Sequence, residues 1–126
     1  MFVRFVVDEL DPHSGERCGV FQVMFRLARR GELSLDEQAR WDRLREWFNT
    51  HLERPESLSR STRAHASEVA ISWFRDSARR HIARAREIAA LLGERGVQVE
   101  MLRTSRPGYV VYEDEFQVVA EPFRGE

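Results

Sequence analysis

The sequence predicts an α+β fold, a two-layer sandwich in which about three helices cover one face of a three- or four-stranded, mainly antiparallel sheet. Two observations lead to this prediction. Residues 108–121 contain two runs rich in valine and aromatic residues that flank an acidic break, which is the pattern of a β-hairpin. Upstream, three segments place apolar residues at helical spacing. The length of 126 residues suits one domain, and we expect a single domain over 1–126.

The composition is that of a folded protein with balanced charge. Hydrophobic residues make up 42% of the chain and the formal net charge is −1, which argues against a general polyanion or membrane-surface binder. The balance hides an asymmetry, because the middle third is basic and lies between two acidic thirds. Residues 1–53 hold 8 arginines and 10 acidic residues, residues 54–106 hold 11 arginines and 6 acidic residues, and residues 107–126 hold 1 arginine and 5 acidic residues. All 20 basic residues are arginine. A GC-rich genome is the simpler explanation, and selection for bidentate anion recognition is the alternative.

The sequence predicts a cytoplasmic location. Cys18 is the only cysteine, so an intramolecular disulfide is impossible and the chain suits a reducing compartment. The apolar run at 2–7 is too short for a signal peptide and is followed directly by acidic residues. No stretch approaches the roughly 20 apolar residues that a transmembrane helix needs.

The first half of the chain is predicted to contain one strand followed by a helical hairpin. Residues 1–7 alternate as a strand that joins the C-terminal strands, and turn-forming residues make 8–19 a loop. Helical spacing over 20–30 ends at Gly31, where a left-handed C-terminal cap is favoured. A capping box at 34–37 then begins a second helix that reaches about Leu52, shortly before Pro55.

The second half is predicted to contain a long loop, a third helix and most of the sheet. Residues 54–68 are polar and without period, so they read as a long loop that is functional or mobile. The third helix is expected to begin between Ser67 and Trp73 and to end before Gly96. Alternation at 97–102 predicts a strand, and the terminal hairpin is expected to turn at 113–115.

The tail of the chain resembles that of a group of small bacterial proteins. The similarity is closest over 106–123, Arg-Pro-Gly-Tyr-Val-Val-Tyr-Glu-Asp-Glu-Phe-Gln-Val-Val-Ala-Glu-Pro-Phe, with Ile-Ser-Trp-Phe at 71–74. It extends loosely over most of residues 1–124. Because no activity is attached to that group, the resemblance implies a bacterial, single-domain protein and nothing about its chemistry.

The predicted third helix carries a candidate binding site. At about 100° per residue, Arg75, Arg79 and Arg86 fall in a narrow stripe beside the apolar arc. Arg60 and Arg63 on the preceding loop extend the same basic region. Forked guanidiniums in a row bind phosphates or the carboxylates of an acidic partner. In the alternative interpretation they pair within the domain, with the acidic residues of the hairpin: Glu113, Asp114, Glu115 or Glu121.

Two tryptophans are candidates for a protein interface. Trp47 lies at the edge of the apolar stripe of the second helix, and Trp73 lies at the start of the predicted third helix. Tryptophans at such borders usually belong to the rim of the core and less often anchor an interface. A homodimer through this rim is therefore one hypothesis.

A catalytic role is a further alternative. His81 lies near the apolar arc, and the hairpin supplies Tyr109, Tyr112, Glu113 and Asp114. A His–carboxylate pair acts as general acid and base if the fold brings the two groups within about 3 Å. The sequence has no nucleophile motif, Gly-rich phosphate loop or metal-ligand spacing. We therefore assign no catalytic residue, no metal and no cofactor.

Together these observations predict a non-catalytic, cytoplasmic binding or regulatory module that acts through protein–protein interaction. Nucleic-acid or other polyanion binding through the arginine stripe of the third helix is the first alternative, and a small enzyme with a His–carboxylate pair is the second. Ionic strength separates the first two, because polyanion binding weakens steeply as salt rises.

Overall fold

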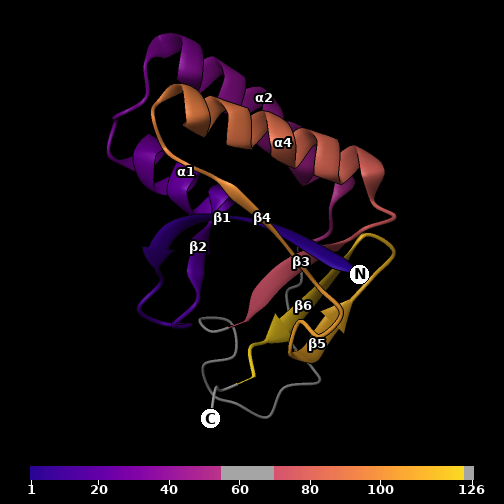
Figure 1. Ribbon diagram of the computed structural model, residues 1–126. Coiled ribbons are helices and arrows are strands. Elements are labelled where there is room, and N and C mark those ends of the chain that lie inside the picture. The colour runs from indigo at the N-terminus through magenta and orange to yellow at the C-terminus, as the bar shows by residue number, and fades with distance from the viewer. Residues whose placement is uncertain (55–69, 124–126) are drawn as a thin grey trace.

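Three helices cover one face of a six-stranded antiparallel sheet in the computed structural model, which describes residues 1–54 and 70–123 (Figure 1). The elements are β1 (Phe2–Leu10), β2 (Arg17–Gly19), α1 (Val20–Arg29), α2 (Leu35–His51), β3 (Ile71–Arg75), α4 (Arg79–Glu94), β4 (Glu100–Thr104), β5 (Tyr109–Glu113) and β6 (Gln117–Glu121). The α+β class is confirmed. The prediction of three or four strands is wrong, because β2 and β3 also join the sheet.

The strand β3 replaces the predicted beginning of the third helix. Its isoleucine, tryptophan and phenylalanine all suit a pleated surface, and Ile71 and Phe74 are buried. A turn closed by the bond from Ala78 N to Arg75 O separates β3 from α4, which begins only at Arg79. The prediction failed because Ile71 and Phe74 are three residues apart, a spacing that also continues the apolar stripe of the helix.

Local signals set the other helix ends as predicted. Ser34 Oγ accepts from Glu37 N at 3.1 Å, and Glu37 Oε1 accepts from Ser34 N at 2.8 Å, which confirms the capping box. Gly31 and Gly96 both adopt positive φ, at 66° and 84°, directly after their helices. No helix within residues 1–54 and 70–123 is long and apolar enough to cross a membrane.

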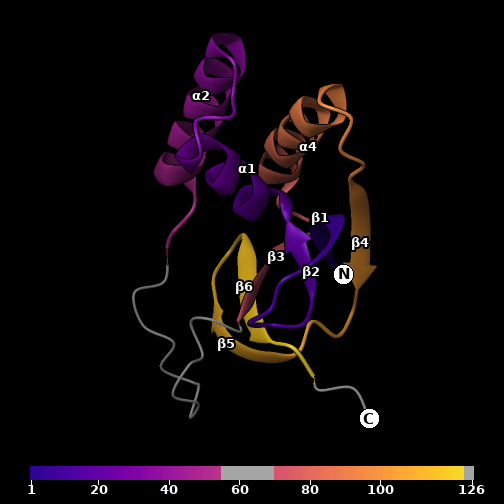
Figure 2. The same cartoon turned by 90° about the vertical axis from the view of Figure 1, so that its left-hand side faces the viewer.

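The central strand β1 pairs along both of its edges. One edge pairs with β4 over residues 2–6. The opposite edge is shared end to end: Phe2 and Val3 pair with β3, whereas Val6 and Leu10 pair with β2. Arg4 and Phe5 pair with neither, so the sheet divides between β2 and β3 (Figure 2). We call this division the fork. Beyond it, β3 pairs with β6, and β6 with β5.

The main core lies between the helices and the sheet. Buried side chains from one face of β1 and β3, including Val3, Phe5 and Phe74, pack against α1, α2 and α4. Trp41 of α2 is fully buried there. At the far end of the helical layer, ion pairs join α2 to α4 and to the residue that follows it: Arg40 with Glu94, and Glu37 with Arg95.

Candidate functional site

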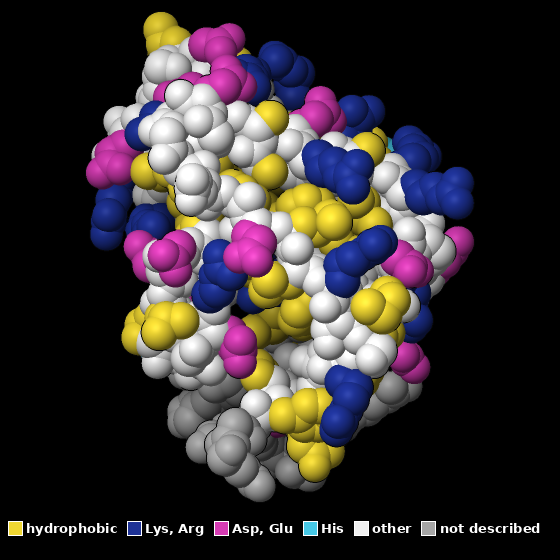
Figure 3. All heavy atoms as spheres, in the orientation of Figure 1, with side chains coloured by type: hydrophobic (Ala, Val, Ile, Leu, Met, Phe, Trp, Pro, Cys, Tyr) yellow, Lys and Arg dark blue, Asp and Glu magenta, His cyan; other side chains and the backbone are white. Residues whose placement is uncertain are grey.

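A cleft with a volume of about 890 Å³ opens at the fork. Its walls come from β1, β2 and β3, the beginning of α1, the end of α2 and the turn between β5 and β6, which can be followed in Figure 2. Figure 3 shows the surface hollowed between β2 and β3. Most of the apolar lining forms one surface, here called the floor: Phe5, Val20, Phe21, Phe25, Phe48, Ile71 and Phe74. A concave, largely apolar cleft with a few polar groups is the usual form of a binding site.

Ring contacts hold the floor in place. Phe21 meets Phe48 edge to face, with ring centroids 4.8 Å apart. Phe48 in turn stacks near Phe74 at 6.0 Å. Phe48 and Phe74 are buried, whereas Phe21 is only partly buried. Because three different elements, α1, α2 and β3, contribute these rings, the floor exists only in the folded domain.

Arg4 lies at the base of the fork. Its Nη2 donates to the carbonyl oxygen of Arg17 at 2.7 Å, and its guanidinium lies 5.9 Å from the ring centroid of Trp73. A Cβ atom at Gly19 would come within 3.4 Å of Nη2, so glycine leaves room for the guanidinium. Burial lowers the pKa of Arg4 from its usual value, and the nearby carboxylate of Glu16 offsets part of this effect. Arginine remains protonated under such conditions, so the cleft contains a partly buried cation.

The helix α1 begins at the same cleft. Its N-cap is Gly19, which offers no side-chain acceptor, and its first turn contains no acidic residue. Val20, Phe21 and Gln22 line the cleft. The positive end of the helix dipole therefore adds to the charge of Arg4.

The polar wall of the cleft is a hydrogen-bond network around Asp114. Its Oδ1 accepts from the backbone N–H groups of Phe116 and Gln117, at 2.8 and 3.0 Å. Its Oδ2 accepts from the Tyr112 hydroxyl and from Gln117 Nε2, at 2.9 and 3.1 Å. Gln117 Nε2 also donates to the carbonyl of Glu53 at 2.7 Å. Burial by itself would raise the pKa of Asp114, but these hydrogen bonds lower it below its usual value.

His81 is buried and does not form the proposed pair with a hairpin carboxylate. Its Nε2 hydrogen-bonds the carbonyl oxygen of His51 at 2.8 Å, so Nε2 carries a proton. Its ring stacks on Phe116 with centroids 4.4 Å apart. Within residues 1–54 and 70–123, the hydrogen bonds of His81 and Asp114 do not join these two residues.

The fold separates Arg75 from the other arginines of the predicted stripe. Arg75 lies on β3, where its Nε donates to the carbonyl oxygen of Asp114 at 2.8 Å. Its Nη2 forms an ion pair with Glu113 at 3.2 Å. Arg75 thus pairs within the domain, with an acidic residue of the hairpin.

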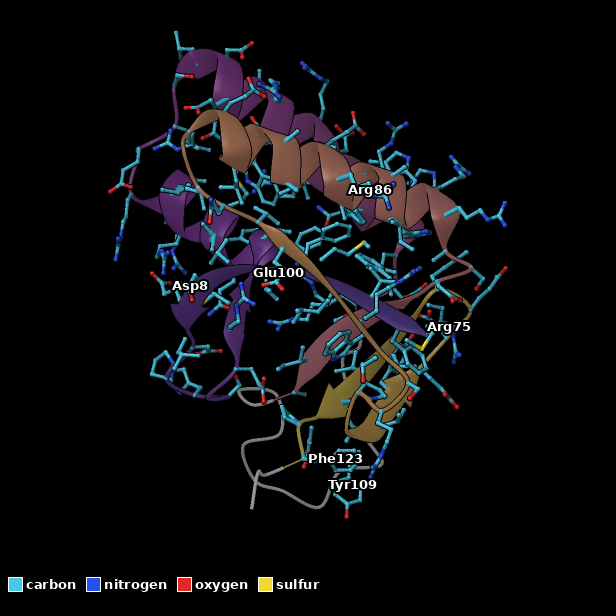
Figure 4. All side chains as sticks on the ribbon, viewed as in Figure 1. Asp8, Arg75, Arg86, Glu100, Tyr109 and Phe123 are labelled. Carbon is cyan, nitrogen blue, oxygen red and sulfur yellow. The ribbon has the colours of Figure 1, made fainter. Side chains whose placement is uncertain are left out.

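Arg79 and Arg86 do share the exposed side of α4. The Nη2 of Arg86 lies 3.9 Å from Met101 Sδ, and Figure 4 shows Arg86 on the helix and Arg75 well apart from it. Arg79 has no ion pair with any residue in the part of the chain that the structure describes. Arg60 and Arg63, and the predicted loop from residue 55 onward, lie outside the described residues.

The two tryptophans occupy different environments. Trp47 stacks on His51 with ring centroids 4.3 Å apart, and the guanidiniums of Arg80 and Arg84 each lie 5.6 Å from its ring. Trp73 belongs to β3 and lies beside Arg4. An interface through these residues stays a prediction.

Comparison with protein-family models, curated proteins and solved structures finds no match for this chain. The site is therefore interpreted from its own geometry. Across residues 1–54 and 70–123, no group of three or more His, Cys, Asp and Glu side chains is arranged to hold a metal ion. The sequence interpretation missed the cleft. One signal for it exists in the sequence: Arg4 is the single charge among residues 1–7, which are otherwise apolar.

Proposed function

We propose that the protein is a non-catalytic binding module that takes up an extended segment of a protein partner in the cleft. One observation carries this proposal: an open strand edge and the apolar floor meet in the same cleft. β3 pairs with β6 along one edge, while on its other edge only Phe74 and Arg75 pair with β1. The remaining residues of that edge, 71–73, pair with no described strand, and Ile71 and Ser72 line the cleft.

An extended peptide satisfies both features of the cleft. Its backbone N–H and C=O groups bond an open strand edge, and alternate side chains enter adjacent pockets. Here the pocket is the phenylalanine floor, which excludes water from an apolar side chain. Charges of both signs lie at the rim, among them Arg45, Arg54 and Glu115, and they suit the mixed charges of a peptide.

The polar groups near the cleft support binding rather than chemistry. Both carboxylate oxygens of Asp114 accept hydrogen bonds from the hairpin itself. The Nε2 of His81 is engaged with a backbone carbonyl. Groups fixed in this way shape a surface and are poorly placed to exchange protons with a substrate.

The test is selection from a display library of unstructured peptides, followed by NMR titration of the protein with the enriched peptide. We expect amide shifts to concentrate at residues 19–25, 48–52 and 71–74. Absence of any enriched peptide would contradict the proposal. Shifts confined to Arg79, Arg86 and their neighbours on α4, with steep loss of binding as salt rises, would contradict it as well and favour polyanion binding.

A matched pair of variants places the binding site. Ser72 lines the cleft and its side chain is exposed, whereas Ser105 is exposed in the turn after β4, outside the cleft. Ser72→Tyr fills part of the cleft without removing a core side chain, so we expect peptide affinity to fall at least about tenfold. Ser105→Tyr should leave affinity unchanged.

A further inference from the structure

The guanidinium of Arg4 has more donors than the surrounding protein uses. An arginine carries several N–H donors, and within residues 1–54 and 70–123 Arg4 makes one hydrogen bond, from Nη2 to the Arg17 carbonyl. No described carboxylate forms an ion pair with it. A partly buried cation with unused donors is unfavourable unless an acceptor reaches it. The cleft is the route by which an acceptor can reach Arg4.

The surroundings of Arg4 are rich in donors and short of available acceptors. The indole Nε1 of Trp73, the ring beside Arg4, is buried with no hydrogen-bond partner in the described part of the chain. Glu16 and Asp11 act on Arg4 through their charge, but neither forms an ion pair with it. The Asp11 carboxylate accepts instead from its own loop, from His13 N at 3.0 Å and from Ser14 Oγ at 3.3 Å.

The fork also limits how a peptide strand can lie along β3. Next to the open edge at 71–73, Phe74 pairs with Val3 of β1. A strand added to that edge therefore cannot continue past Phe74, because β1 already occupies the position. The added strand must end at the base of the fork, where Arg4 follows Val3 in the chain. A guanidinium favours the C-terminus of a peptide over its N-terminus, because the terminal carboxylate carries the opposite charge.

We propose that Arg4 binds a carboxylate at the base of the cleft, and that the peptide taken up there ends with its free C-terminal carboxylate. The planar guanidinium matches the two oxygens of a carboxylate. The floor then holds the last apolar side chains of the peptide. This inference rests on the proposed function and adds the chemistry that the cleft recognises.

The probe pair is N-acetyl-phenylalanine, which carries the carboxylate, and N-acetyl-phenylalanine amide, which has the same ring and no charge. In NMR titrations of the full chain, we expect the acid to bind at least about tenfold more tightly than the amide. The side-chain Nε–H of Arg4 and the indole N–H of Trp73 should shift with the acid. Equal affinity for the two compounds would overturn the inference. Binding of inorganic phosphate at the same resonances, tighter than the acid, would also overturn it.

Two variants separate Arg4 from the general positive charge of the protein. Arg4→Met should abolish the roughly tenfold preference for the acid, whereas Arg43→Met, exposed on α2 and outside the cleft, should leave the preference intact. Retention of the preference in Arg4→Met would overturn the inference. If Arg4→Met does not fold, the comparison of acid and amide on the unchanged chain still tests whether the cleft recognises a carboxylate.

The peptide from the library separates this inference from the proposed function. The same peptide is made with a free and with an amidated C-terminus. If both forms bind the cleft equally, the role of Arg4 is wrong and the peptide-binding function stands. If neither form shifts the cleft residues, the proposed function itself is wrong.

Discussion

The Nε2 atom of His81 and the carbonyl oxygen of His51 lie 2.8 Å apart, and their hydrogen bond joins the first turn of α4 to the last residue of α2. Carbonyl groups at a helix C-terminus lack intrahelical partners, so this bond satisfies one of them. The His81 ring also stacks on Phe116 in the turn of the β5–β6 hairpin. A histidine that the sequence offers as an acid–base group instead connects two helices and the hairpin.

We therefore predict that His81→Phe destabilises the protein by about 1–3 kcal/mol. Phenylalanine keeps an aromatic ring against Phe116 but leaves the partly buried carbonyl of His51 without its donor. His81→Ala should cost more, because it also leaves a cavity. Urea unfolding followed by circular dichroism measures both changes. Arg43→Ala, an exposed change on α2, is the control and should stay within about 0.5 kcal/mol of the wild type. If His81→Phe is as stable as the wild type, this role of His81 is contradicted.

Gly108 is predicted to be intolerant of any side chain. Its φ is 134°, and a Cβ atom there would overlap the carbonyl oxygen of Glu121 on β6. Figure 4 shows Tyr109 and Phe123 together at this end of the hairpin, and their rings are 5.2 Å apart. Gly108→Ala should cost at least about 2 kcal/mol, because β5 must move away from β6.

The control for Gly108 is a glycine inside a helix. A Cβ atom at Gly93 of α4 would meet no described residue within 4 Å beyond the backbone of its own helix. Gly93→Ala should stabilise the protein by about 0.5–1 kcal/mol, because alanine favours helix over the unfolded chain. Thermal unfolding of both variants checks the pair. Equal effects of the two changes would show that the close approach at Gly108 is unimportant.

The parts of the fold that were predictable from sequence depend on a few neighbouring residues. The capping box at Ser34 and Glu37, and the glycine stop at Gly96, involve contacts within a few positions of the chain. The β5–β6 hairpin was predictable for the same reason. β3 was not, because its apolar spacing fits a strand and a helix equally, and only pairing with β1 and β6 decides between them.

Sequence patterns could not predict the cleft, because the cleft depends on the register in which distant strands pair. The fork exists because β3 reaches β1 only at Phe2 and Val3 while β2 begins its pairing at Val6. No local preference fixes where two distant strands stop pairing. The unusual feature in the sequence was Arg4 inside the apolar run at 1–7, and its meaning depends on which strand lies beside it. The placement of Arg75 in the arginine stripe was wrong for a related reason, since it assumed one continuous helix from Arg75 onward.

Arg75 and Arg79 are predicted to differ in their effect on stability. Arg75 bonds the Asp114 carbonyl and the Glu113 carboxylate, and lies 5.8 Å from the ring centroid of Phe2. Arg75→Ala should therefore destabilise the protein by about 1–2 kcal/mol. Arg79 is exposed at the start of α4, where a positive charge opposes the helix dipole. Arg79→Ala should be neutral or slightly stabilising in the same urea titration. A stability loss at Arg79 equal to that at Arg75 would contradict the separation of the two residues.

The lowered pKa of Asp114 predicts how the stability of the protein changes as the pH falls. Burial opposes ionisation of this carboxyl, but the donors around it hold its pKa below the usual value in the folded state. A group whose folded pKa is depressed contributes stability above its unfolded pKa, and that contribution disappears as pH falls through the folded pKa. Asp114→Asn should thus destabilise the protein at neutral pH by about 1–3 kcal/mol, because an amide NH₂ faces the donors that the carboxylate accepted.

The difference in unfolding free energy between wild type and Asp114→Asn should narrow as pH falls from ~7 towards ~3, since only the wild type loses the ionised acceptor. Taking the difference removes the pH dependence of other carboxyls with lowered pKa, such as Glu9 and Glu37, because both proteins contain them. Asp8, which is exposed, supplies the matched control. Asp8→Asn should stay close to wild type at every pH. If the difference in unfolding free energy between wild type and Asp114→Asn is the same at both ends of the titration, the destabilisation comes from packing rather than from the charge.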